Sequence, residues 1–187
     1  LVAGKISAGL AGTLATDALT VTDGNLASDA ISGKFTGDVS LVAGSVTLKL
    51  NADVASSALP ASVRPVLAER VRLDADIFRD HEGQVSADPF AIASGELSAS
   101  GRVRTANQEI DASISGRLGD VGLLAQGASG AVDLAVRATG ALAAPEVSLT
   151  VTSDRVEAAG REIAGLKLEA TGRADIANPA ADVSLTG

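Results

Sequence analysis

The sequence predicts an all-β fold, built as a long and mainly antiparallel meander. Apolar and polar residues alternate along much of the chain, which is the pattern of strands with one buried face. The 20 glycines against 5 prolines indicate frequent chain reversals, because glycine supplies the positive φ that tight turns need. Aromatic residues make up only 2% of the chain, so small and aliphatic side chains must line any interior.

The alternation divides the chain into about a dozen or more short strands. In the clearest segments, Val, Leu, Ile and Ala point one way and charged or hydroxyl side chains point the other. These segments are residues 45–51, 71–77, 97–104, 110–115, 132–138, 147–151 and 166–170. Weaker candidates are residues 5–10, 18–22, 26–31, 34–42, 84–87, 90–93, 155–158, 174–176 and 182–186.

The connections favour pairing of strands in sequence order, since Gly, Asn-Pro and Asp-Gly separate them at hairpin spacing. One short helix is predicted around residues 60–70, where Val63, Val66 and Leu67 share a face and Pro60 lies in the first turn. Pro65 opposes this helix, because its ring kinks or restarts one. Residues 118–126 are predicted to form a short helical turn or a loop. We expect a single β-rich segment over residues 1–187, with a sub-boundary near residues 56–70.

Charge and composition exclude several functional classes. A net charge of −8 and a pI near 4.6 argue against nucleic acid as a partner, because phosphate binding needs clustered cations. The chain has no cysteine and therefore neither disulfides nor thiolate metal sites. The sequence contains no run of about 18 apolar residues, so it predicts no membrane-spanning helix. Leu1 in place of an initiator Met, and an end within the alternation at residues 182–186, lead us to expect a piece of a longer polypeptide.

Residues suited to catalysis or to metal binding are scarce. His81 is the single histidine and lies in the charged turn 79–83, where a surface position is expected rather than a ligand. Four acidic residues lie around it, namely Asp74, Asp76, Asp80 and Glu82. They lack the glycine-bearing loop of known calcium sites, so we predict that they are exposed residues of a strand and a turn. Residues 127–130, Gly-Ala-Ser-Gly, predict a turn, since no triad histidine accompanies the serine. We predict that the chain is not an enzyme and has no catalytic residues, no metal site and no cofactor.

Internal repetition is present but degenerate. Residues 140–150, which run from a Gly-to-Pro step into Val-Ser-Leu-Thr, are echoed by residues 172–186, and residues 38–41 are a partial third copy. The spacing between the clear copies is roughly 30 residues, and it favours an extended β array or a solenoid over a closed globule.

The C-terminal third of the chain contains the most specific sequence motifs. Residues 118–124 form a short Asp- and Leu-containing segment, residues 131–139 form a glycine-bounded strand, and Gly140 and Pro145 lead into residues 147–150. Residues 154–160 then precede another alternating strand. In these features the chain resembles the TamB and AsmA-like family of envelope proteins.

The resemblance implies a long sheet curled into an open, apolar trough, often described as a β-taco. Members of that family are anchored in the inner membrane and reach across the periplasm. They are linked to phospholipid transport, to outer-membrane biogenesis and to the secretion and assembly of autotransporters. The resemblance therefore implies phospholipid acyl chains, adjacent segments of the same polypeptide and an outer-membrane β-barrel protein as partners.

The apolar side of the alternation supplies the candidate site, because acyl chains are attracted by burial of apolar surface and need no oriented partners. An ordinary closed core is the alternative for the same positions. A structural β-solenoid of an adhesin or autotransporter passenger is the alternative function. The residues expected to line a lipid groove are Val46, Leu48, Leu50, Val71, Leu73, Ile77, Leu97, Val103, Ile110, Ile114, Val132, Leu134, Val136, Val147, Leu149, Val151, Leu166 and Leu168.

Overall fold

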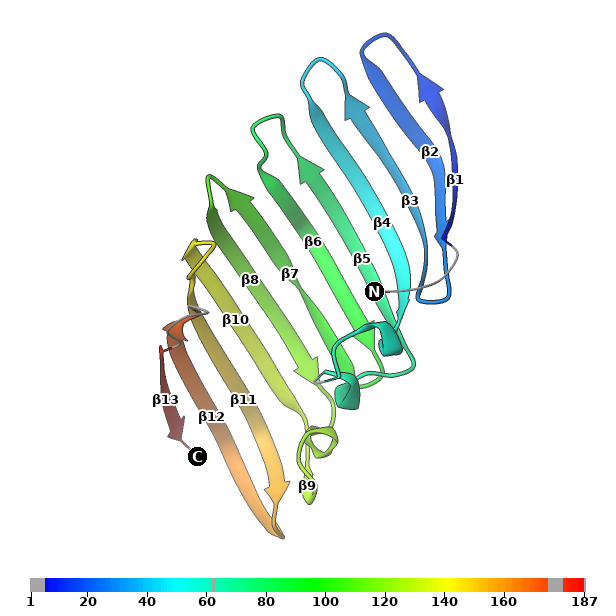
Figure 1. Cartoon of the computed structure of the whole chain (residues 1–187). Helices are drawn as coiled ribbons and strands as arrows, with labels where there is room; N and C mark the ends of the chain where they lie inside the picture. Colours follow the sequence, from blue (N-terminus) through cyan, green and yellow to red (C-terminus); the bar gives the residue numbers. More distant parts are fainter. Residues whose placement is uncertain (1–5, 62, 175–179, 187) are drawn as a thin grey trace.

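The protein forms one antiparallel sheet, shown by a computed structural model that describes residues 6–61, 63–174 and 180–186 (Figure 1). The strands are β1 Ser7–Leu14, β2 Ala18–Ala27, β3 Ile31–Ser40, β4 Ser45–Ala55, β5 Arg70–Arg79, β6 Val85–Ser94, β7 Leu97–Ala106, β8 Glu109–Leu118, β9 Ala128–Ser129, β10 Val132–Ala141, β11 Glu146–Ala158, β12 Arg161–Arg173 and β13 Ala180–Thr186. Three 3-10 turns accompany them: η1 Ser56–Ala58, η2 Arg64–Val66 and η3 Val121–Leu123.

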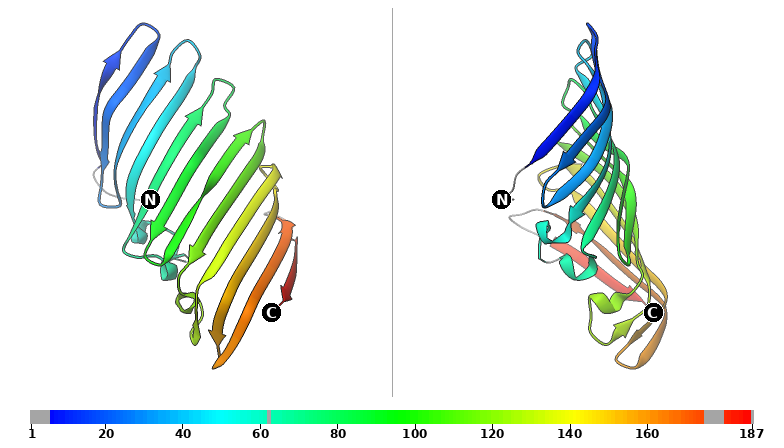
Figure 2. Two further views of the ribbon diagram at one scale, coloured as in Figure 1. Left: turned by 180° about the vertical axis from the view of Figure 1, so that it is seen from behind. Right: turned by 90° about the vertical axis from the view of Figure 1, so that its right-hand side faces the viewer.

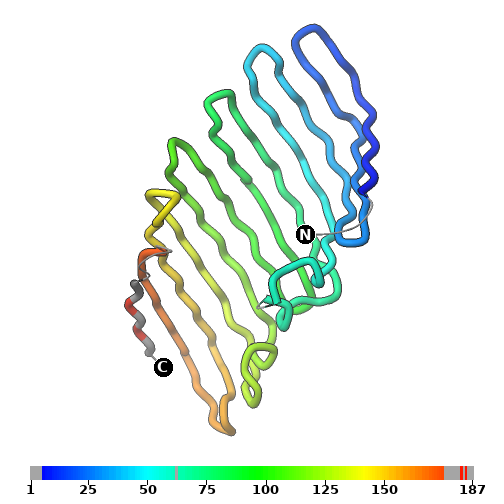
Figure 3. The backbone as a smooth tube through the Cα atoms, viewed as in Figure 1, coloured from blue at the N-terminus to red at the C-terminus, as the bar shows by residue number. Residues whose placement is uncertain are grey.

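The strands pair in sequence order from β1 to β8 and on through β10 to β13, with only the two-residue β9 off this path. Every pairing in the described residues is antiparallel, which confirms the predicted all-β meander. The sheet stays open, with β1 and β13 at its two edges, and it twists strongly from one edge to the other (Figures 1, 2 and 3).

Tight turns set the register between neighbouring strands. Asn107 and Gln108 join β7 to β8 with φ of 51° and 64°. Two consecutive positive φ values produce a hairpin whose twist matches that of the strands. The register that follows pairs Ala106 with Glu109 and continues without a shift to Leu97 and Leu118.

Bulges interrupt the register in several strands. In β6 the pairing shifts between Ala87 and Phe90, where Asp88 and Pro89 lie, a place that suits proline because it has no N–H to donate to the ladder. The separately predicted strands 84–87 and 90–93 are therefore halves of one strand. The β2 strand has a similar shift between Val21 and Gly24.

Three further sequence predictions need correction or fall outside the described residues. Residues 26–31 were expected as a strand, but β2 ends at Ala27 and β3 begins at Ile31, with a turn between them held by the Ser28 hydroxyl. Residues 155–158 are the end of the long strand β11 rather than a separate strand. The strand expected at residues 174–176 falls mostly on residues outside the described ranges, and Ala174 itself is not in a strand.

The helix expected over residues 60–70 is reduced to the single 3-10 turn η2, preceded by η1, and Arg70 already belongs to β5. Pro65 occupies the start of η2, and a proline further inside an α-helix would remove a hydrogen bond and clash with the preceding turn. The Arg64 guanidinium instead donates to the carbonyl oxygens of Leu59 and Ser57, which holds this connection together. The helical turn expected within residues 118–126 is present as η3.

Two long connections cover one end of one face of the sheet. Residues 56–69 join β4 to β5, and residues 119–131 join β8 to β10; both lie on the same side of the sheet (Figure 2). Their residues Val66 and Val121 pack against the core cluster of Leu118, Val132 and Val156. We call this the covered end of the sheet and the opposite one, with the β3–β4 and β5–β6 turns, the open end.

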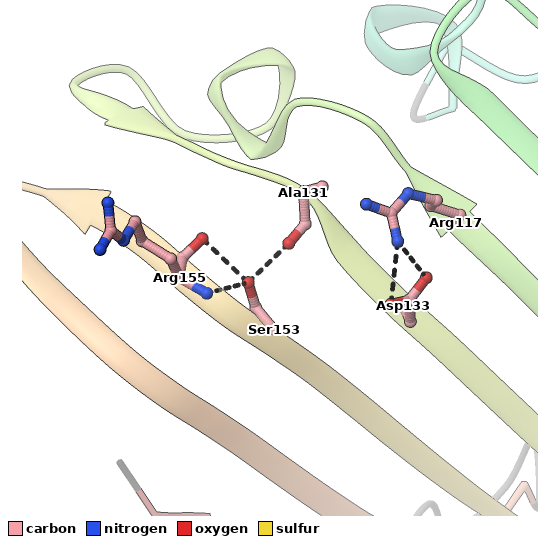
Figure 4. A network of polar contacts seen from close by, with 5 residues as sticks. All are labelled: Arg117, Ala131, Asp133, Ser153 and Arg155. Atoms are coloured by element: carbon pink, nitrogen blue, oxygen red, sulfur yellow. Dashed lines mark hydrogen bonds and ion pairs between the residues drawn. The ribbon is translucent and has the colours of Figure 1, made fainter.

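Two buried serines attach these connections to the sheet. The Ser94 hydroxyl donates to the Arg70 carbonyl oxygen at 2.9 Å and accepts from the Ala68 N–H at 2.9 Å. The Ser153 hydroxyl lies 2.6 Å from the Ala131 carbonyl oxygen and also accepts from the Arg155 N–H (Figure 4). Each serine hydroxyl thus satisfies backbone groups that the change from connection to strand leaves unpaired.

Removing the Ser153 hydroxyl tests this attachment. We expect Ser153→Ala to lower the free energy of unfolding by about 1 kcal/mol, because buried backbone groups lose a hydrogen-bond partner. Ser115→Ala, at an exposed position of β8 on the other face of the sheet, should change it by less than about 0.5 kcal/mol. Urea unfolding of both variants measures the difference, and equal midpoints would contradict the anchoring role of Ser153.

Candidate functional site

The register places all of the predicted groove residues on one face of the sheet. In an antiparallel sheet, residues directly opposite each other project to the same side. Leu48 pairs with Ile77, Val136 pairs with both Ile114 and Leu149, and Val151 pairs with Leu168. The same chain of pairings links Val46, Leu50, Val71, Leu73, Leu97, Val103, Ile110, Val132, Leu134, Val147 and Leu166 to this side. We call this side the apolar face and the other the polar face.

The apolar face extends beyond the predicted residues. Register adds positions on the strands before β4 and on β6, namely Leu10, Leu14, Leu19, Leu26, Ile31, Phe35, Val39, Val85, Phe90 and Ile92. Phe35 lies directly against Gly24 of the neighbouring strand, where an added Cβ would clash with the ring. The apolar face is therefore continuous from β1 across the sheet.

No second layer of the described structure packs on most of this face. The chain exposes 11932 Å², whereas a compact protein of 18.5 kDa is expected to expose about 8,200 Å². Of the predicted groove residues, only Val71 and Val132 are buried; Val46 is exposed and the others are partly exposed. In the described residues, the cluster of buried side chains that pack on one another consists of Leu118, Val132 and Val156 at the covered end; the other buried apolar residues lie within the single sheet.

Large aliphatic side chains at the two ends of the apolar face differ in exposure, although Val21 and Ala112 between the ends are also buried. Leu118 and Val132 are 2% and 5% exposed beside the connections, whereas Val46 and Val85 at the open end are 36% and 40% exposed. The outer strand β1 is more open still, with Leu14 at 74%. Exposed apolar surface of this extent is typical of an interaction site.

The polar face is an array of exposed ion pairs between neighbouring strands. Arg117 Nη1 lies 3.0 Å from Asp133 Oδ1 on the adjacent strand, with both side chains more than half exposed (Figure 4). Others join Arg104 to Asp88, Lys49 to Asp76 and Arg72 to Asp53. Exposed pairs like these contribute at most about 1 kcal/mol each to the free energy of unfolding, so their main effect is to make this face hydrophilic.

The hollows that the described residues form between strands are open, and two of them carry several charged side chains. One of about 340 Å³ is lined by Arg137, Thr139, Glu146, Thr171 and Arg173 among others, and one of about 330 Å³ includes Lys34, Lys49, Asp74 and Asp76. The charged side chains of both lie on the polar face. Neither hollow has the enclosed apolar lining of a typical small-molecule site.

The acidic residues around His81 do not converge. Asp74 accepts from the Asn51 side chain, Asp76 lies 3.6 Å from the Lys49 ammonium, and Asp80 accepts the backbone N–H groups of Glu82 and Gln84. The His81 ring is 3.9 Å from the Glu82 carboxylate, and both side chains are mostly exposed. Within the described ranges, no group of three His, Asp or Glu residues could hold a metal ion.

Chelation provides a check on these carboxylates. Because Asp74 and Asp76 engage neighbouring polar side chains on the sheet surface, we expect EDTA to leave the thermal midpoint of the purified chain unchanged. Differential scanning calorimetry with and without the chelator measures this, with added calcium as the companion sample. A lower midpoint in EDTA that calcium restores would show a structural metal site instead.

None of the helical segments in the described residues is long and apolar enough to cross a bilayer. Comparison of the chain with protein-family models, with curated proteins and with solved structures finds no match. The resemblance to the TamB and AsmA-like family therefore remains a prediction from short sequence motifs. The apolar face is the structural feature from which a function can be argued.

Proposed function

We propose that this chain is a non-catalytic segment of a lipid-binding scaffold whose apolar face holds phospholipid acyl chains. The observation that carries the proposal is the continuous, partly exposed apolar face opposite a charged one. A face of this kind attracts a partner that is apolar along its length and needs no oriented hydrogen bonds. Acyl chains meet that description, since each buried methylene contributes about 0.8 kcal/mol.

The dimensions of the face suit this partner. Twelve strands in one path span about 50 Å between the outer strands, and a ten-residue strand is about 33 Å long. The acyl chains of one membrane leaflet reach about 15 Å, half the thickness of a hydrocarbon core. Several chains can lie side by side on such a surface, and a continuous row of aliphatic residues lets a chain slide between positions without a polar barrier.

The lack of large aromatic anchors also favours acyl chains over a folded protein partner. Protein interfaces concentrate their binding energy in Trp, Tyr and Arg, and the chain has neither Trp nor Tyr. Among the predicted groove residues every side chain is Val, Leu or Ile. Apart from Phe35 and Phe90, the large side chains of the face are therefore aliphatic and similar in size, which suits a flexible acyl chain.

The wider setting of the proposal follows from the sequence resemblance. In that setting the segment belongs to an inner-membrane-anchored protein of the periplasm, and it contributes to lipid transport and outer-membrane biogenesis, with secretion or assembly of outer-membrane β-barrel proteins as the associated process. Adjacent segments of the same polypeptide would continue the apolar face. The β-solenoid alternative is disfavoured by the fold, because a solenoid stacks coils around a dry core and the described strands form one antiparallel layer.

A charge on the apolar face tests the proposal. Val136 is half-buried between Ile114 and Leu149, so Val136→Asp would place a carboxylate against acyl chains at a desolvation cost of several kcal/mol. We expect the folded variant to lose bound phospholipid in native mass spectrometry, and the full-length parent carrying it to lose lipid transfer while staying abundant.

The neighbouring Arg137 supplies the matched control. Arg137 is exposed on the polar face, so Arg137→Asp should keep bound lipid and change the free energy of unfolding by less than about 0.5 kcal/mol. Circular dichroism establishes that both variants are folded. Unfolding of Val136→Asp would show that the face is an interior, and full lipid binding by the folded variant would show that this strand does not contact lipid.

A further inference from the structure

The apolar face carries almost no charge, and its charged exceptions are two arginines at opposite ends. On β1–β8 and β10, Arg79 is the one charged side chain that the register of the described residues places on this face, where it pairs with Val46 and Val85. Arg161 pairs with Ala158 at the β11–β12 hairpin, two residues beyond the pair of Val156 and Ile163; because Val156 belongs to the buried cluster, Arg161 lies on the apolar side at the covered end. Arg79 lies at the open end of β5 and is exposed.

Arg79 makes no ion pair with any described residue, although acids lie close by in the chain. Asp80 uses a carboxylate oxygen to accept the N–H groups of Glu82 and Gln84, and Glu82 lies near the His81 ring. The polar-face arginines Arg72, Arg104 and Arg117 all have carboxylate partners. Arg102 and Arg137 on the polar face have no ion pair among the described residues either, but Arg79 differs from them because it borders the apolar face, where an anion and an apolar chain can bind together.

The surroundings of Arg79 match the boundary between the headgroup and the acyl chains of a lipid. On one side of it along β5 lie Ile77, Ala75 and Leu73, all on the apolar face. On the other side are the turns at the open end, where Leu41 and Val42 are 56% and 84% exposed. The β3–β4 and β5–β6 turns touch there, since a Cβ on Gly44 would meet the His81 side chain.

We propose that a phospholipid binds the apolar face in one orientation, with its phosphate at Arg79 and its acyl chains running along β4 and β5 toward the covered end. This inference rests on the proposed function. The distance supports it: Arg79 is eight residues from Val71, or about 26 Å, which leaves room for acyl chains of about 15 Å before the connections close the face. A guanidinium suits phosphate because it forms two parallel charge-assisted hydrogen bonds.

The open end is then the end at which lipid enters and leaves. The connections 56–69 and 119–131 occupy the other end, where Val66 and Val121 already fill the space over Leu118 and Val132. An acyl chain that arrives from the open end meets exposed aliphatic residues first and buried ones last.

The test compares a phospholipid with the diacylglycerol that has the same acyl chains. The purified 187-residue chain is incubated with each lipid, and bound lipid is measured by native mass spectrometry. We expect the unchanged chain to prefer the phospholipid, and Arg79→Gln to weaken phospholipid binding about fivefold while diacylglycerol binding stays the same. Arg79→Lys should restore part of the preference, since it keeps the positive charge but loses the two parallel hydrogen bonds of the guanidinium.

Two matched variants and one competitor complete the experiment. Arg102→Gln removes an exposed cation from the polar face, and Arg161→Gln removes the cation at the covered end; neither should alter the preference. Excess inorganic phosphate alone should not displace the lipid, because the acyl chains supply most of the affinity. Equal binding of both lipids, no effect of Arg79→Gln, or an effect of Arg161→Gln in its place would overturn the orientation and leave acyl-chain binding intact. Binding of neither lipid would overturn the proposed function itself.

Discussion

The structure depends on keeping the side-chain alternation of each strand in phase with that of its neighbours. A slip by one residue in any pairing would send the apolar side chains of that strand to the polar face. The two-residue hairpin at Asn107 and Gln108 fixes the phase between β7 and β8, and cross-strand ion pairs such as Arg117 with Asp133 favour the same register from the opposite side. The apolar face exists only because these local restraints agree along the whole meander.

The single layer also explains where stability is concentrated. A sheet usually gains its stability by packing one face on another layer, and here that packing is limited to the connections at the covered end. Leu118, Val132 and Val156 form the buried cluster, and Ser94 and Ser153 attach the covering segments through their hydroxyls. The rest of the sheet relies on its ladder of backbone hydrogen bonds and, under the proposed function, on the lipid bound to the apolar face. Bound lipid should therefore stabilise the folded chain.

Alternation alone was sufficient to predict the fold class and the shared face, because a period of two is a direct property of extended backbone. It failed where the backbone leaves that period. At the β6 bulge the apolar parity changes from Val85 and Ala87 to Phe90 and Ile92, and in β11 it changes from Val151 to Val156, past two exposed residues. The predicted strand 71–77 and charged turn 79–83 place the end of this strand two residues early, because Arg79 is the last residue of β5. The short helix was overpredicted because apolar spacing favoured it while Pro65 limits it to one turn.

Photo-crosslinking with a phospholipid that carries a diazirine within its acyl chain tests the central claim most directly, because it reports which face the chain touches. After irradiation, peptide mass spectrometry locates the adducts residue by residue. Adducts at alternate positions such as Leu48, Ile77 and Leu149, with none at Lys49, Asp76 or Ser148, are the predicted result. Adducts distributed equally over both faces, or concentrated in the hollows around Arg137 and Asp74 on the polar face, would contradict an acyl-binding apolar face.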